Sequence, residues 1–190
     1  MEKEQIKLVV IGGSSGSLDA IFTIFTLLDI SFTIPIIIVM HRSNNINTNL
    51  VKVLSAKTHL LVKEADEKEI LKSGIVYLAP PDYHLLIEKD KSLSLDNSEK
   101  VQYSRPSIDV TFQSAADVFK KNLLGIILSG ANSDGASGVA SIKKNEGRVI
   151  VQDPASAQIP YMPQQAIAQT RADKIITLNE IAIYLNNLQK

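Results

Sequence analysis

The chain of 190 residues has the size and composition of one globular domain, because 45% hydrophobic residues suffice for a single buried core. Twenty basic and twenty acidic side chains cancel, which argues against a broad electrostatic attraction to nucleic acid or an anionic membrane. The absence of cysteine excludes disulfides, thiol catalysis and cysteine-based metal sites. Any catalysis must therefore use oxygen or nitrogen groups.

The sequence contains no targeting or membrane segment that we can identify. The N-terminal stretch MEKEQIK has mixed charge and no long apolar core behind it, unlike a signal peptide. The longest apolar run, IPIIIVM at residues 34–40, is far shorter than the roughly 20 residues that span a bilayer. We therefore expect a soluble, cytoplasmic protein, with one domain over residues 1–190, no membrane insertion and no nucleic-acid partner.

Buried strands and helices alternate at the start of the chain. Residues 6–12 and 36–39 are apolar without polar alternation, as in strands covered on both faces. Between them, apolar residues recur at three- and four-residue steps and predict a helix with one apolar face; these are Leu18, Ile21, Phe22, Phe25 and Leu28. Residues 50–56 resemble a short helix.

The pattern changes between residues 60 and 96. Apolar runs at 75–78, 83–87 and 92–95 are separated by the turn formers Pro80, Pro81 and Asp82 and by residues 88–91. This spacing predicts antiparallel hairpins.

Strand and helix patterns alternate again in the C-terminal part. Ser107 is a plausible N-cap of a helix carrying Ile108, Phe112, Ala115 and Phe119. Strands follow at 123–128, 148–151 and 174–177, with helices between and after them. The whole pattern predicts a doubly wound α/β fold: a mostly parallel sheet flanked by helices, with an antiparallel hairpin insertion. Ligands of such folds bind at the carboxyl ends of the strands.

The stretch KLVVIGGSSGS, residues 7–17, places small residues between the first strand and the first helix. Gly12, Ser14 and Gly16 spell G-x-S-x-G in the context where that motif exposes a nucleophilic serine. A phosphate-binding turn is the competing interpretation. The stretch lacks the G-x-G-x-x-G spacing and a Walker lysine, however, and the second strand ends at His41 rather than at a ribose-binding acid.

A serine nucleophile needs a base, and histidine suits neutral water. Of the three histidines, His59 falls in a predicted solvated loop and His84 in a hairpin, where a packing role is the simpler interpretation. His41 ends a buried strand beside the strand that leads to Ser14. It is therefore the candidate base.

The base needs a carboxylate to orient it. Asp134, in SGANSDGASG, follows the third buried strand and opens the next helix, so the simpler interpretation is that it caps that helix. A helix N-terminus would also keep the carboxylate ionised. Ser14, His41 and Asp134 are thus all predicted at the carboxyl edge of one sheet.

The motifs also resemble those of the chemotaxis-receptor methylesterases, the CheB-type catalytic domain. The resemblance covers nearly the whole chain; the matching stretches are VVIGGSSGS, IIIVMHRS, GIVYLAPPDYHL, SRPSIDVTFQSAA, GIILSGANSDGASG and PASAQIPYMPQQAI. The YLAPPDYH and SRPSIDV segments have no physical assignment from the sequence alone.

The resemblance implies that Ser14 attacks, His41 acts as general base and acid, and Asp134 orients His41. It also implies that the backbone N–H groups of Ser15 and Ala131 form the oxyanion hole, and that neither a metal nor an organic cofactor is needed. The implied reaction is hydrolysis of glutamate γ-methyl esters, and deamidation of glutamines, on the cytoplasmic helices of methyl-accepting chemotaxis receptors. These receptors would be its partner in a phosphorelay signal transduction pathway.

Three features depart from the family pattern. Ser17 and Asn132 replace usual glycines, and only MEKEQ precedes the first strand, so we expect a standalone domain without the receiver domain that commonly precedes it. Two alternatives stay open. One is an esterase of the same mechanism with another protein or small-molecule substrate, and the other is a non-catalytic nucleotide- or protein-binding module.

Overall fold

The computed structural model of the protein describes residues 5–41 and 49–189. Residues 1–4, residues 42–48 and the last residue lie outside these ranges, so the predicted N-terminal stretch MEKE and the end of the IIIVMHRS motif are not described. The described strands are β1 (Leu8–Gly13), β2 (Ile36–Met40), β3 (Leu61–Glu64), β4 (Ile75–Leu78), β5 (His84–Ile87), β6 (Leu93–Asp96), β7 (Leu123–Ile127), β8 (Arg148–Gln152) and β9 (Lys174–Ile176).

The helices alternate with these strands along the chain. They are α1 (Ser17–Thr26), α2 (Leu50–Ser55), α3 (Ile108–Phe119), α4 (Ala136–Lys144), α5 (Tyr161–Gln169) and α6 (Leu178–Asn187). Short 3₁₀ turns η1 (Lys120–Asn122) and η2 (Pro154–Ser156) precede β7 and follow β8.

Within the described residues, seven strands form one parallel sheet in the order β3-β4-β2-β1-β7-β8-β9, and β5 and β6 form a separate antiparallel pair. Strand β1 lies at the centre between β2 and β7, with Gly13 opposite Met40 and Gly12 opposite Ile127. The loops that follow these three strands therefore emerge side by side at one edge. The predicted fold class, a doubly wound parallel sheet with a hairpin insertion, is confirmed.

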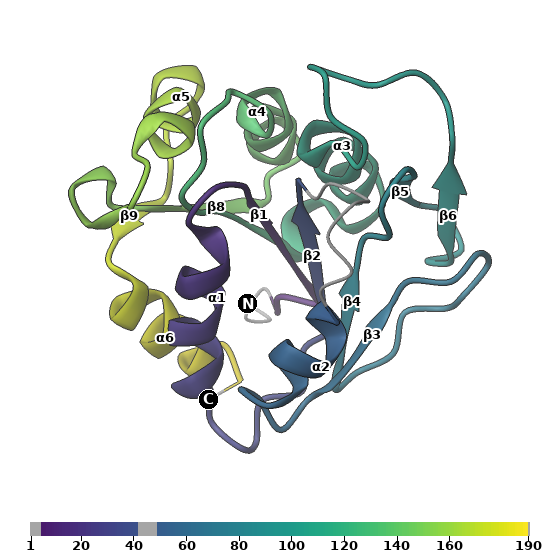
Figure 1. The fold of residues 1–190 in the computed structure, drawn as a ribbon, viewed down its shortest axis with the longest axis horizontal. Helices are drawn as coiled ribbons and strands as arrows, with labels where there is room; N and C mark the ends of the chain where they lie inside the picture. The colour runs from purple at the N-terminus through teal and green to yellow at the C-terminus, as the bar shows by residue number, and fades with distance from the viewer. Residues whose placement is uncertain (1–4, 42–48, 190) are drawn as a thin grey trace.

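Helices cover both faces of the sheet (Figure 1). Helices α1, α2 and α6 pack on one face, where Ile21, Leu54 and Ile181 belong to one apolar cluster with the sheet. Helices α3, α4 and α5 pack on the other face, where Phe112, Val139 and Ala166 belong to a second cluster. Uninterrupted apolar strands such as β1 fit this arrangement, because their alternate side chains enter the two clusters in turn.

The hairpin prediction for residues 75–78 is wrong. Strand β4 joins the main sheet in parallel between β2 and β3, and only β5 and β6 pair as a hairpin. The physical reason is burial: Val76, Tyr77 and Leu78 are almost fully inaccessible, as expected for a strand with helices or loops over both faces. The edge strand β3 was not predicted, since Leu61 is exposed and the segment is short.

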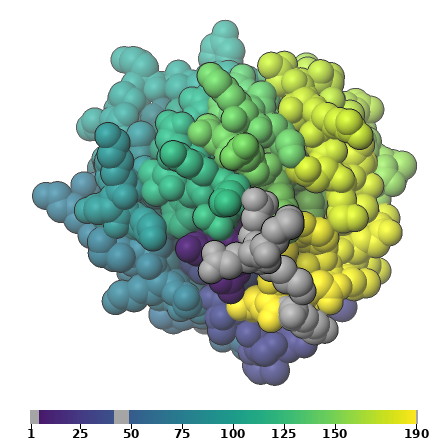
Figure 2. All heavy atoms as spheres, turned by 180° about the vertical axis from the view of Figure 1, so that it is seen from behind, coloured from purple at the N-terminus to yellow at the C-terminus, as the bar shows by residue number. Residues whose placement is uncertain are grey.

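The two edges of the sheet lie on opposite flanks of the molecule, as the view from behind shows (Figure 2). The β3–β6 region, in blue and teal, lies on one flank, and the C-terminal residues, in yellow, lie on the other. In the described parts of the chain, no helix has both the length and the apolar character needed to cross a membrane.

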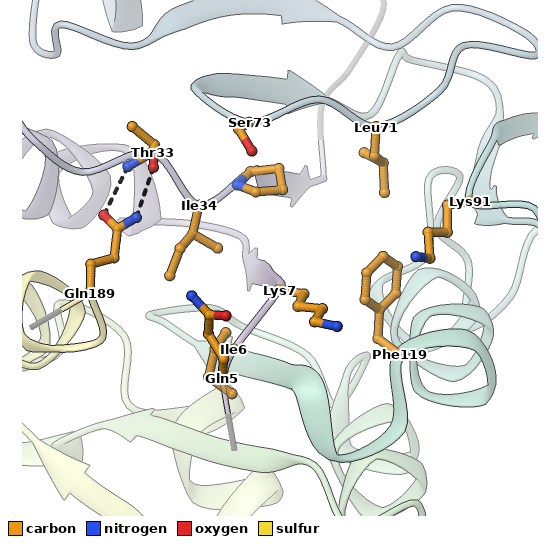
Figure 3. Close-up of a pocket in the computed structure, with 11 residues that line it drawn as sticks. Gln5, Ile6, Lys7, Thr33, Ile34, Leu71, Ser73, Lys91, Phe119 and Gln189 are labelled. Carbon is orange, nitrogen blue, oxygen red and sulfur yellow. Dashed lines mark hydrogen bonds between the residues drawn. The ribbon is translucent and has the colours of Figure 1, made fainter. Parts of the chain in front are cut away.

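A cavity of about 330 Å³ lies beside the amino end of β1, lined among others by Lys7, Thr33, Lys91, Phe119 and Gln189 (Figure 3). Gln189 closes one side through hydrogen bonds with Thr33, and the Lys91 ammonium lies 6.0 Å from the centroid of the Phe119 ring. None of the predicted site residues lines this cavity.

Candidate active site

The turn that carries Ser14 is held from both sides. The Ser14 N–H donates to the carbonyl of Ser129, which follows β7, while the N–H and the hydroxyl of Ser17 both donate to the Ser14 carbonyl, at 3.0 and 2.6 Å. Ser17, which replaces a usual family glycine, is fully buried and braces the turn. The backbone of Ser14 is therefore fixed at the edge of the sheet, and the residue is only partly buried.

His41 directly follows β2, on the strand beside β1. Its Nε2 lies 2.7 Å from Oδ2 of Asp134, which follows β7. The His41 side chain is 14% exposed, and that of Asp134 is fully buried. The structure therefore brings two of the three predicted residues into direct contact, although they are 93 positions apart in the chain.

Asp134 is the centre of a buried set of hydrogen bonds. Besides His41, its carboxylate accepts from the N–H of Ile108 and Asp109 at 2.7 and 2.9 Å, and from the hydroxyl of Ser107 at 2.8 Å. These donors form the N-terminus of α3. The expectation that Asp134 caps the helix that follows it, α4, is wrong: its carboxylate caps α3 instead.

The cap of α4 comes from the neighbouring helix. Asp109, in the first turn of α3, accepts hydrogen bonds from the N–H of Gly135 and Gly138 at 2.9 and 2.7 Å. Its other carboxylate oxygen accepts from the side-chain amide of Gln102 at 2.8 Å. Asp109 and Asp134 thus exchange caps between two adjacent helices, an arrangement that no pattern in the sequence indicates.

The two carboxylates differ in their electrostatics. Burial opposes ionisation of Asp134, but hydrogen bonds from His41 and from the backbone of Asp109 and Ile108 outweigh it and lower the pKa of Asp134. For Asp109, burial dominates and, together with the charge of Asp134, raises its pKa despite the two glycine N–H donors. Asp134 is therefore held ionised, as a group that orients an imidazole must be.

Asn132 lies between His41 and the backbone of Asp134. Its Oδ1 accepts from the Asp134 N–H at 3.1 Å, and its Nδ2 lies 3.1 Å from Nδ1 of His41. Among the described residues, Asn132 is not one of those with positive φ. The backbone of Asn132 therefore has no conformation that requires glycine, and its side chain contacts both His41 and Asp134.

The predicted oxyanion-hole groups lie in the same two loops. Neither the N–H of Ser15 nor that of Ala131 donates a hydrogen bond to any other described residue, and both residues are exposed. Free N–H groups beside a nucleophile are what an oxyanion hole requires. The oxyanion hole formed by Ser15 and Ala131 stays a prediction.

Gly13 of β1 and Met40 of β2 lie opposite each other in the sheet, and Ser14 and His41 are the residues that follow them. No hydrogen bond joins the Ser14 hydroxyl to His41 among residues 5–41 and 49–189, and Nδ1 of His41 contacts Asn132 instead. In the same ranges, no group of three or more histidine, aspartate or glutamate side chains is arranged to hold a metal ion.

The other two histidines lie where the sequence predicted, His59 in a solvated loop and His84 in a packing position. His59 is exposed, and His84 is buried, with Nδ1 accepting from the Ser107 N–H and Nε2 donating to the carbonyl of Glu99. His84 therefore supports the segment that holds Asp134. The hydrogen bond between Ser107 and His84 joins the two segments YLAPPDYH and SRPSIDV, which had no physical assignment from the sequence alone.

The fold and the site define a doubly wound α/β protein with a histidine–aspartate pair and an adjacent serine turn at the carboxyl edge of its sheet. Comparison with known proteins narrows this class. The family model described as CheB methylesterase matches residues 9–185, and the chain belongs to that family. The resemblance seen in the sequence motifs is confirmed.

Named relatives and a solved structure agree with this assignment. A protein of Leptospira interrogans, provisionally named protein-glutamate methylesterase/protein-glutamine glutaminase, is 48% identical over 92% of this chain and 90% of its own length. A protein with the same name, without the provisional qualifier, from Trichodesmium erythraeum is 34% identical over 94% of this chain, which spans 51% of that relative. The crystal structure of the Thermotoga maritima CheB methylesterase catalytic domain superposes with a TM-score of 0.91 at 33% identity, covering 96% of this chain and 98% of that one.

Proposed function

We propose that the protein is a serine hydrolase that cleaves glutamate γ-methyl esters, and deamidates glutamines, on the cytoplasmic helices of chemotaxis receptors. The observation that supports this most strongly is the 2.7 Å contact between His41 and the buried, ionised Asp134, at the sheet edge where the Ser14 turn also ends. The names of the relatives supply the reaction, since the geometry alone fits many acyl transfers. The proposed place of action is the cytoplasm.

In this mechanism the Ser14 hydroxyl attacks the ester carbonyl while His41 takes its proton at Nδ1, the ring nitrogen not bound to Asp134. Asp134 stabilises the imidazolium that forms. The N–H groups of Ser15 and Ala131 donate to the oxyanion, each worth about 3 kcal/mol in the transition state. His41 then protonates the departing methoxide, and water attacks the acyl-enzyme by the reverse proton transfers.

The experiment that tests the hydrolase chemistry is labelling with a fluorophosphonate probe, which reacts with activated serines. We expect the wild type to be labelled, Ser14→Ala not to be labelled, and His41→Ala to be labelled at least about 100-fold more slowly, because a general base contributes that much. Ser73→Ala and His59→Ala, which lie away from this edge of the sheet, should be labelled at the wild-type rate. A folded wild type that resists the probe would support the non-catalytic binding module instead.

A second measurement addresses the substrate. Methylated receptor fragments should release methanol with the wild type and not with Ser14→Ala, and the corresponding glutamine-containing fragments should release ammonia. Probe labelling without methanol release would retain the esterase mechanism and point to another protein or a small-molecule substrate.

A further inference from the structure

The side-chain amide of Asn132 has a fixed orientation. Its Oδ1 accepts the Asp134 N–H, so the group that faces His41 is Nδ2, at 3.1 Å from Nδ1. An amide nitrogen donates hydrogen bonds and does not accept them. The contact therefore requires an unprotonated Nδ1 on the imidazole ring.

The contact on the other side of the ring completes this assignment. The Asp134 carboxylate, 2.7 Å from Nε2, can only accept, so Nε2 carries the proton. Neutral His41 is thereby hydrogen-bonded at both ring nitrogens, and its single lone pair, on Nδ1, is already engaged. The same lone pair must take the proton of the Ser14 hydroxyl in the proposed reaction.

We propose that Asn132 competes with Ser14 for Nδ1 of His41 and so restrains the base in the resting enzyme. The proposal rests on the proposed function, since it needs Ser14 as the nucleophile. Two observations support it: Asn132 contacts Nδ1, and among the described residues no hydrogen bond joins Nδ1 to Ser14. Asn132 is a positioning residue in this scheme, because it acts through His41.

The restraint has to be released in each turnover. Once Nδ1 is protonated, two N–H groups face each other across 3.1 Å, so the amide must turn away. Asn132 is partly exposed, which leaves its side chain room to do so. The release breaks one neutral hydrogen bond; such bonds contribute about 1 kcal/mol, which corresponds to about a fivefold change in rate.

The test compares two substitutions with opposite effects. Asn132→Gly removes the competing donor, and we expect the fluorophosphonate labelling rate to rise about fivefold. Asn132→Asp retains an acceptor for the Asp134 N–H but turns an oxygen toward Nδ1, which favours a doubly protonated ring. Labelling should then fall at least about tenfold, because a protonated imidazole cannot act as a base. Asn145→Asp, the same change at the end of α4, should be labelled like the wild type.

A spectroscopic measurement reads the contact without relying on activity. In ¹⁵N NMR of histidine-labelled protein at about pH 8, the wild type should show His41 protonated at Nε2 and unprotonated at Nδ1. Asn132→Asp should show both nitrogens protonated at the same pH. The wild-type spectrum needs no variant to fold, and a proton on Nδ1 in that spectrum would overturn the proposal.

The remaining outcomes separate this proposal from the proposed function. If labelling depends on Ser14 but Asn132→Gly is no faster than wild type, or Asn132→Asp is no slower, Asn132 does not compete for the base and the hydrolase assignment stands. If the wild type shows the expected protonation but no labelling, the contact with Asn132 stands and the hydrolase assignment fails.

Discussion

Gly16 shows how a single backbone conformation exposes the candidate nucleophile. Its φ of 80° lies in the left-handed region and lets the chain turn sharply from β1 into α1. A Cβ at this position would lie 2.6 Å from Oε1 of Gln158 and 2.8 Å from Oγ of Ser129. Gly16 is therefore required both by its conformation and by its surroundings.

We predict that Gly16→Ala slows fluorophosphonate labelling at least about tenfold and lowers the free energy of unfolding by about 2 kcal/mol or more. The conformational cost of alanine at positive φ is about 1 kcal/mol, and crowding against Gln158 and Ser129 adds to it. Labelling kinetics and urea denaturation measure the two effects. The slower labelling follows because relief of the crowding displaces the turn that carries Ser14.

Gly74→Ala is the matched control for this substitution. Gly74 has nearly the same φ, 77°, but a Cβ there would meet no atom within 4 Å. In the Gly74→Ala variant, the free energy of unfolding should therefore fall only by the conformational cost of about 1 kcal/mol, and the labelling rate should equal that of the wild type. Equal losses of stability and activity in the two variants would show that crowding around Gly16 plays no part.

At the same scale, the sequence indicates where Ser14, His41 and Asp134 lie better than it indicates what they contact. Ser14, His41 and Asp134 each follow a strand that is recognisable from its uninterrupted apolar residues, and parallel strands bring their carboxyl ends to one edge. Two contacts depend instead on the geometry of side chains from segments distant in sequence. One joins Asp134 to Ser107, and the other joins Asn132 to His41. No local pattern encodes that geometry.

Between elements, the notable feature is the exchange of caps between α3 and α4. The two helices approach closely, since a Cβ on Gly138 would lie 2.6 Å from the Cβ of Phe112. Their N-termini therefore lie side by side, and each carboxylate reaches the free N–H groups of the neighbouring helix. The arrangement ties the loop of Asp134 to two helices at once.

We predict that Asp109→Ala lowers the free energy of unfolding by about 3 kcal/mol. It leaves the buried N–H groups of Gly135 and Gly138 without their acceptor, and each unsatisfied buried group costs about 1–3 kcal/mol. Probe labelling should also slow, because the loop that positions Asp134 loses its anchor. Urea denaturation of wild type and variant at neutral pH measures the loss of stability.

Thr177→Ala provides the comparison for an ordinary cap. Thr177 forms a capping box with Glu180 at the exposed start of α6, far along the chain from the site. Loss of this cap should lower the free energy of unfolding by about 1 kcal/mol and leave the labelling rate unchanged. If Asp109→Ala cost no more than Thr177→Ala, the exchanged caps would not stabilise the protein beyond a normal helix end.

The helices and strands are predictable where apolar residues recur at a clear spacing, and they are hard to predict where that spacing is weak. Helix α3 begins after Ser107 as predicted, because an N-cap serine precedes a clear apolar stripe. Strand β4 was assigned to a hairpin because Pro80 and Pro81 follow it, yet its buried residues mark it as a parallel strand. Turn formers show where a strand ends but do not show which strand pairs with it.

For the molecule as a whole, the candidate site and the stability of the fold are linked through Asp134. Burial raises the pKa of Asp109, whereas for Asp134 hydrogen bonds from His41 and α3 outweigh burial and lower its pKa. A carboxyl whose pKa is lower in the folded state stabilises that state above its unfolded pKa, and one whose pKa is raised has the opposite effect. The two groups therefore oppose each other in the acid stability of the wild type.

Comparison with Asp134→Asn tests the contribution of Asp134, including the effect of its charge on the pKa of Asp109. We expect the wild type to be more stable than this variant, with the difference shrinking as the pH falls below the unfolded carboxyl pKa of about 3.9, by up to about 1.4 kcal/mol per pH unit. The sign follows from the lowered pKa: the unfolded chain takes up the proton first, so acid favours unfolding of the wild type and has no such effect on asparagine. Urea denaturation at a series of pH values from about 5 to 3 measures the difference. A difference that stays constant down to about pH 3 would mean that Asp134 titrates alike in both states, and that its contacts with His41 and α3 do not stabilise its charge.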